Sequence, residues 1–129
     1  MYIAYNPNPV RSDPVGDCAV RAIAKALDVT WENAYTKLST NGFLMGDIMN
    51  SDAVLAAVLR SAGFKRGAVD NECPDCYTVA DFAEDNKDGT YVVKSDGHVA
   101  TIIDGNLFDT FDSSNRTLLW FWEKHNEKG

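Results

Sequence analysis

The sequence lacks the features of secreted, membrane and nucleic-acid-binding proteins. No segment is apolar enough to span a bilayer, and the first residues lack the basic region and unbroken apolar run of a secretion signal. Lys and Arg number 12 against 19 Asp and Glu, which gives a formal net charge of −7, and no segment concentrates the basic residues. A nucleic-acid backbone would therefore be repelled. We expect a soluble, cytoplasmic protein with neither a nucleic-acid nor a membrane partner.

Cysteine is also scarce, since the chain has only Cys18, Cys73 and Cys76. An odd number cannot form a closed set of disulfides and leaves at least one thiol to explain. The Cys73-Pro-Asp-Cys76 spacing suits a redox pair, a bridge formed on oxidation or half of a zinc site. A structural zinc site needs four ligands, however, and the sequence has no second Cys-x-x-Cys or His pair to complete one. A thioredoxin-like motif follows a strand, and no strand pattern precedes Glu72. We therefore predict no metal and no cofactor.

The length of 129 residues and the 45% apolar composition predict a single domain spanning residues 1–129. Residues 1–16 contain three prolines and should form an extended arm, and the polar residues 124–129 should fray. Helical spacing of apolar residues, with capping residues before it and glycines after it, predicts four helices, at about 18–28, 31–41, 52–62 and 79–86.

The pattern changes after residue 89 to alternating and β-branched residues, which predicts strands at 91–94, 99–103, 107–111 and 118–122. The turn sequences at 95–97 and 104–106 are typical of antiparallel hairpins. Helices followed by a small antiparallel sheet indicate an α+β fold.

Cys18 is the best candidate nucleophile. It lies in the first turn of the first predicted helix, where the positive end of the helix dipole stabilises a thiolate. The bases available are His98 and His125, and His125 lies in the polar tail. We therefore predict that His98, at the start of a strand, is the base. Taken singly, a cysteine packed inertly and a histidine bonded to the backbone are the commoner roles.

A third group should orient the imidazole of His98. If residues 104–106 form a three-residue loop, Ile103 pairs with Leu107 and His98 faces Asp112. A two-residue loop shifts this pairing by one position, so Asp112 stays within one residue of His98 in either case, whereas Asp109 would face residues 100–102. We therefore predict Asp112 as the partner of His98. The alternative for Asp112 is a turn carboxylate that bonds Ser113 or Ser114.

Three segments carry a resemblance to a known family. Residues 15–24, with Gly16-Asp-Cys18, the Gly97-His98 strand start and the segment from Asp109 to Ser114 resemble papain-like cysteine peptidases of bacteria and phages. They are similar to the bacteriocin-processing, double-glycine peptidases. The resemblance covers roughly residues 6–122 and implies a papain-like fold with Cys18, His98 and Asp112 as the catalytic triad.

The resemblance also implies a glutamine a few residues before the cysteine, as a donor to the oxyanion. No glutamine occurs in this sequence. Asn8, Ser12 or Asp13 would have to substitute, and only the Asn8 amide is a neutral N–H donor. Asn8 is therefore the candidate for the oxyanion hole, together with the backbone N–H of Cys18.

We expect a cysteine hydrolase that cleaves a peptide or isopeptide bond of a protein or peptide substrate through an acyl-enzyme. A deamidase or an acyltransferase would use the same triad, and the loop at residues 41–50 could line a peptide groove. The alternative is a catalytically inactive papain-like binding or inhibitor protein of a phage or mobile element, which the missing glutamine favours. If phage-encoded, the protein would act in the host cytoplasm. The sequence does not set the oligomeric state.

Overall fold

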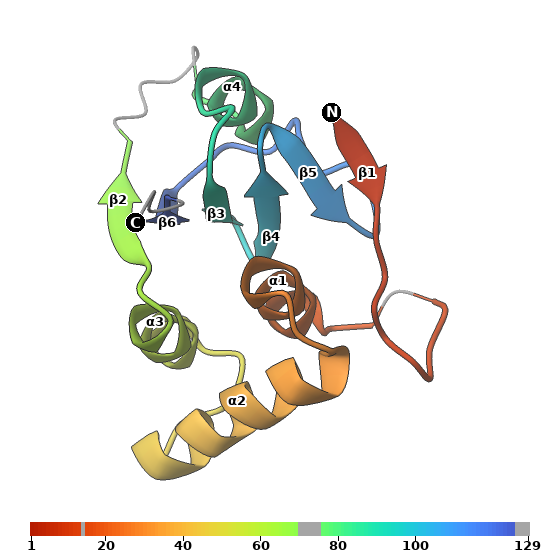
Figure 1. The fold of residues 1–129 in the computed structure, drawn as a ribbon, viewed down its shortest axis with the longest axis vertical. Helices are drawn as coiled ribbons and strands as arrows, with labels where there is room; N and C mark the ends of the chain where they lie inside the picture. The colour runs from red at the N-terminus through yellow and green to blue at the C-terminus, as the bar shows by residue number, and fades with distance from the viewer. Residues whose placement is uncertain (14, 70–75, 126–129) are drawn as a thin grey trace.

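The computed structural model describes residues 1–13, 15–69 and 76–125. They form an α+β fold in which the N-terminal helices pack on a six-stranded, mostly antiparallel sheet, with Cys18 at the start of the first helix (Figure 1). The predicted fold class is thus confirmed. The sheet is mixed rather than purely antiparallel, because one edge strand runs parallel to its neighbour.

The four helices are α1 (Cys18–Leu27), α2 (Trp31–Met45), α3 (Asp52–Ser61) and α4 (Val79–Asp85). Thr30 and Ser51 cap α2 and α3 by accepting a bond from a backbone N–H of the first turn. Thr78 and Asp81 form a capping box at α4, as the sequence indicated. Asp17 occupies the cap position of α1, but its side chain makes no capping bond there.

Helix α2 does not stop at Asn41-Gly42 as expected. It continues to Met45 and ends at Gly46, which has a left-handed conformation. Gly42 therefore lies inside the helix. A glycine suits this position because a Cβ there would lie 3.0 Å from the Asp47 carbonyl oxygen. The first half of the expected 41–50 loop is therefore helical, and Phe43 and Leu44 are exposed on it.

The strand order in the sheet is β1-β5-β4-β3-β6-β2. The central strands β3 (Thr90–Ser95), β4 (His98–Ile103) and β5 (Asn106–Asp109) form consecutive hairpins. The last strand, β6 (Trp120–Lys124), does not extend this meander but pairs with β3. Two edge strands were not predicted: β1 (Tyr2–Ala4), in the expected extended arm, lies parallel to β5, and β2 (Lys65–Ala68) lies antiparallel to β6.

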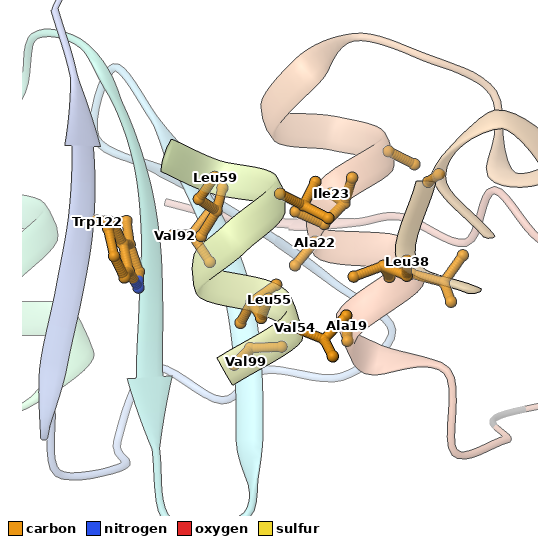
Figure 2. Packing of buried hydrophobic residues seen from close by; sticks show 14 of the residues in the cluster. Ala19, Ala22, Ile23, Leu38, Val54, Leu55, Leu59, Val92, Val99 and Trp122 are labelled. Atoms are coloured by element: carbon orange, nitrogen blue, oxygen red, sulfur yellow. The ribbon is translucent and has the colours of Figure 1, made fainter. Parts of the chain in front are cut away.

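The apolar residues form one cluster on each face of the sheet. Figure 2 shows the larger cluster, in which residues of α1, α2 and α3 pack with the sheet residues Val92, Val99 and Trp122. The smaller cluster joins α4 to the opposite face through Phe82, Leu107 and their neighbours. The segment predicted as a strand at 118–122 is therefore only partly core, since Leu118 and Trp122 are buried whereas Leu119 is exposed.

A buried hydrogen bond fixes α1 to the centre of the sheet. The hydroxyl of Thr101, on β4, is fully buried and donates to the backbone carbonyl of Ala22 at 2.8 Å. Since Cys18 begins α1 and His98 begins β4, this bond helps to set the position of one relative to the other. Among the described residues, no helix is long and apolar enough to cross a membrane.

Candidate active site

Cys18 is the first residue of α1 and is partly exposed, so its thiol is accessible at a helix N-terminus. Burial acts to raise the pKa of this thiol. Hydrogen bonds with the His98 side chain and the Val99 backbone, and the positive charges of His98 and Arg21, outweigh that effect and lower the pKa below its ordinary value. The surroundings of Cys18 therefore favour a thiolate.

His98 lies at the start of β4, and only 8% of its surface is exposed. Burial acts to lower its pKa, but the hydrogen bonds and negative charges of Asp109 and Cys18 raise the pKa to about 9. Its Nε2 atom is hydrogen-bonded to Asp109, so Nδ1 is the ring nitrogen that can bond the Cys18 thiol. The directions of the two pKa shifts both favour the thiolate–imidazolium form of the Cys18–His98 pair.

Asp109, and not Asp112, is the carboxylate beside His98. Its Oδ2 atom lies 2.6 Å from His98 Nε2, and Asp109 is only 2% exposed. Asp112 is instead an exposed turn residue whose Oδ1 accepts the backbone N–H of Ser114. The prediction that Asp112 faces His98 is therefore corrected, and the alternative of a turn carboxylate at Asp112 holds.

The reason for this difference is where strand β5 ends in the β4–β5 hairpin. The loop has two residues, because Ile103 pairs with Asn106 rather than with Leu107. Strand β5 then ends at Asp109, so the alternation that would have carried the pairing on to Asp112 stops there. The Phe111 ring lies beside the histidine, with its centroid 4.9 Å from that of His98.

Three further groups hold the Asp109 carboxylate in place. The Ser113 hydroxyl donates to Oδ2 at 2.7 Å, and the backbone N–H of Thr110 donates to Oδ1 at 2.8 Å. Arg21 reaches Oδ1 from α1 at 3.4 Å. Burial acts to raise the pKa of Asp109, but its bonds with His98, Ser113 and Thr110 and the charge of His98 lower it. Asp109 therefore stays ionised and faces His98 with a fixed oxygen.

Arg21 links this carboxylate to a second one. Its guanidinium also pairs with Asp17, which precedes Cys18, and the exposure of Arg21 is only 5%. The indole N–H of Trp31 donates to Asp17 Oδ2 at 3.0 Å. Sequence reasoning missed Arg21 and Asp109. The i, i+4 spacing of Asp17 and Arg21 was the signal that could have indicated a pair on α1.

Asn8, the candidate oxyanion donor, lies beside this network. Its amide nitrogen donates to Asp17 Oδ2 at 3.3 Å, and its oxygen accepts the backbone N–H groups of Val10 and Arg11. The amide is thus held next to the residue that precedes Cys18. One of its two N–H groups points to Asp17, so only the other could bind an oxyanion.

The remaining candidates have no place in this site. His125 is exposed and its Nε2 lies 3.3 Å from Glu123. Cys73 lies outside the described residues, so the predicted roles of the Cys73–Cys76 pair stay predictions. The described part of the chain contains no cluster of three or more His, Cys, Asp or Glu side chains that could hold a metal ion.

Comparisons with known proteins found no match: no protein-family model, curated protein or solved structure is significantly similar to this chain.

Proposed function

We propose that this protein is a cysteine hydrolase that cleaves a peptide or isopeptide bond through an acyl-enzyme. The observation that carries the proposal is the continuous chain of contacts from the accessible Cys18 thiol through His98 to the buried Asp109. A nucleophile at a helix N-terminus, a histidine within hydrogen-bond reach and a carboxylate that orients the histidine are the elements of such a triad. The resemblance to papain-like peptidases is consistent with this chemistry, with Asp109 taking the role expected of Asp112.

In the first half of the reaction, the Cys18 thiolate attacks the carbonyl carbon, and the carbonyl electron pair moves to the oxygen. The backbone N–H of Cys18 has no partner within the helix because it belongs to the first turn, and it is available to the oxyanion. Imidazolium His98 then gives its proton to the leaving nitrogen. The carbon–nitrogen bond breaks, and the acyl group remains on Cys18 as a thioester.

In the second half, neutral His98 takes a proton from water, whose oxygen attacks the thioester. The carbon–sulfur bond breaks, the acid leaves, and the thiolate and imidazolium are restored. Asp109 keeps the proton of Nε2 in place throughout, so that Nδ1 exchanges protons with substrate and water.

The experiment that tests the proposal is acyl-enzyme trapping. The native protein and its Cys18→Ala variant are incubated with a proteome-derived peptide mixture and quenched in acid, and the intact proteins are weighed by mass spectrometry. We expect acyl adducts, together with cleaved peptides, only with the native protein. Absence of both would contradict the proposal.

One observation favours the second candidate, an inactive binding protein of the same architecture. Asn8, the only neutral amide predicted for the oxyanion hole, already donates to Asp17. An inactive protein would keep the cleft without turnover, and its partner would bind the Cys18→Ala variant as tightly as the native protein. In either case a free reactive thiol suits a reducing compartment, so we propose that the protein acts in the cytoplasm.

A further inference from the structure

Four basic side chains lie over aromatic rings on the face of the sheet that carries α3. The guanidinium of Arg66 lies 4.9 Å from the centroid of the Trp120 ring, and Lys94 Nζ lies 5.9 Å from the same ring. Arg60 lies 5.3 Å from the Trp122 ring, and Lys124 Nζ lies 5.9 Å from the Phe64 ring. We call Arg60, Arg66, Lys94 and Lys124 the cationic patch.

The cationic patch is positively charged, although the chain as a whole is negatively charged. It gathers four of the 12 Lys and Arg residues of a protein whose net charge is −7. Lys94 pairs with Asp52 at 3.1 Å, whereas Arg60 and Arg66 are exposed and have no ion pair within the described residues. The four residues come from α3, β2, β3 and β6, which explains why no single segment of the sequence looked basic.

One end of the cationic patch adjoins the candidate active site. Lys94 pairs across the sheet with Val99, whose backbone is hydrogen-bonded to the Cys18 thiol. On its other side, Lys94 pairs with Trp120. Val99, Lys94 and Trp120 follow one another across β4, β3 and β6, and Arg66 lies over Trp120, so a peptide that reaches the thiol from the β3 side would cross these residues. Figure 2 shows Trp122, a residue of β6, on the same face of the sheet as α3.

We propose that the cationic patch is a substrate subsite, and that it binds an acidic segment of the peptide whose bond lies at Cys18. This inference rests on the proposed function and names the substrate class. The guanidinium of Arg66 can bind a carboxylate through two parallel N–H bonds, while its stacking on Trp120 holds the fork in place. The charge of the patch also attracts an acidic peptide to a protein that otherwise repels it.

Binding is measured by fluorescence anisotropy of a fluorescein-labelled octaglutamate peptide at low ionic strength, where surface charges are little screened. The protein is the Cys18→Ala variant, so binding is observed whether or not Cys18 is a nucleophile. Arg66→Glu is compared with Arg66→Lys and with the control Lys87→Glu. Lys87 is exposed, and it follows α4 near the opposite end of β3.

We expect the octaglutamate to bind and Arg66→Glu to weaken binding about threefold to tenfold, with a smaller loss in Arg66→Lys and none in Lys87→Glu. We also expect the peptide to slow alkylation of Cys18 in the native protein. No binding, an equal loss in Lys87→Glu, or unchanged alkylation would each overturn the proposal. Tighter binding of an oligothymidylate than of octaglutamate would overturn it in favour of a nucleic acid.

Discussion

His98 Nε2 lies 2.6 Å from Asp109 Oδ2, although the two residues are 11 positions apart on neighbouring strands. The contact is buried, and Ser113 bonds the same carboxylate oxygen. A histidine held in this way has one ring nitrogen fixed and the other directed at Cys18. The predictions below test this arrangement and the groups that support it.

The first prediction distinguishes the two aspartates. Asp109→Asn removes the negative charge beside His98, so the pKa of the imidazole should fall from about 9 toward its ordinary value near 6.5. Asp112→Asn should leave it unchanged, because Asp112 is exposed and bonds Ser114 rather than His98. Nuclear magnetic resonance titration of the His98 ring, with His125 as an internal reference, measures both. Equal shifts in the two variants would contradict the assignment of Asp109.

The same pair of variants should differ in catalysis. Asp109→Asn should lower kcat about 10²-fold to 10⁴-fold, because the tautomer and orientation of His98 are no longer fixed. Asp112→Asn should retain nearly native kcat. Turnover of a peptide found in the trapping experiment provides the measurement. A larger loss in Asp112→Asn than in Asp109→Asn would refute this account of the triad.

Activity should depend on pH in the shape of a bell. It should rise as the Cys18 thiol loses its proton, at a pH below that of an ordinary thiol, since the pKa of Cys18 is lowered. It should fall around pH 9, because imidazolium His98 then loses the proton that the leaving group needs. A profile of kcat/KM against pH gives both limbs. Activity that keeps rising beyond pH 10 would exclude His98 as the acid.

Arg21 should be essential to stability. Arg21→Ala leaves the buried Asp17 carboxylate without a cationic partner and removes the cation that Asp109 shares with it, which should cost about 3–5 kcal/mol of unfolding free energy. The control is Arg11→Ala, which breaks the exposed pair with Asp13 and should leave stability close to native. Urea denaturation of both variants provides the comparison. Similar stabilities for the two would show that the buried network is not needed for folding.

Gly67 should be required where β2 meets β6. A Cβ at this position would overlap the Phe121 ring, so Gly67→Ala should force that ring to move and cost about 1–3 kcal/mol. Gly16→Ala is the matched control, since nothing lies within 4 Å of a Cβ there. Thermal unfolding should show a lower Tm for Gly67→Ala alone. An unchanged Tm would mean that the edge strand is looser than the structure indicates.

The helices and central strands could be predicted because their patterns are local. Capping at Thr30, Ser51 and Thr78 and the change to alternating residues after position 89 depend on neighbours in sequence. The edge strands could not, because β2 reads Lys-Arg-Gly-Ala and has no strand propensity of its own. It forms by pairing with β6, a contact between residues far apart in the chain.

The candidate site could be predicted only in part, for the same reason. The helix start and the strand start that position Cys18 and His98 are local features. Both loop lengths favoured Asp112 over Asp109, and the choice is decided instead by the end of β5 at Asp109 and the bend that follows it. Arg21 was missed because its second partner, Asp109, lies 88 positions away.

The most direct test of the central claim is the rate of Cys18 alkylation by iodoacetamide as a function of pH, with peptide mapping to separate Cys18 from the other cysteines. The account predicts a midpoint well below the ~8.5 of a free thiol, shifted upward in His98→Ala. An ordinary midpoint in the native protein, unchanged by His98→Ala, would contradict an activated thiolate at Cys18 and with it the proposed hydrolase.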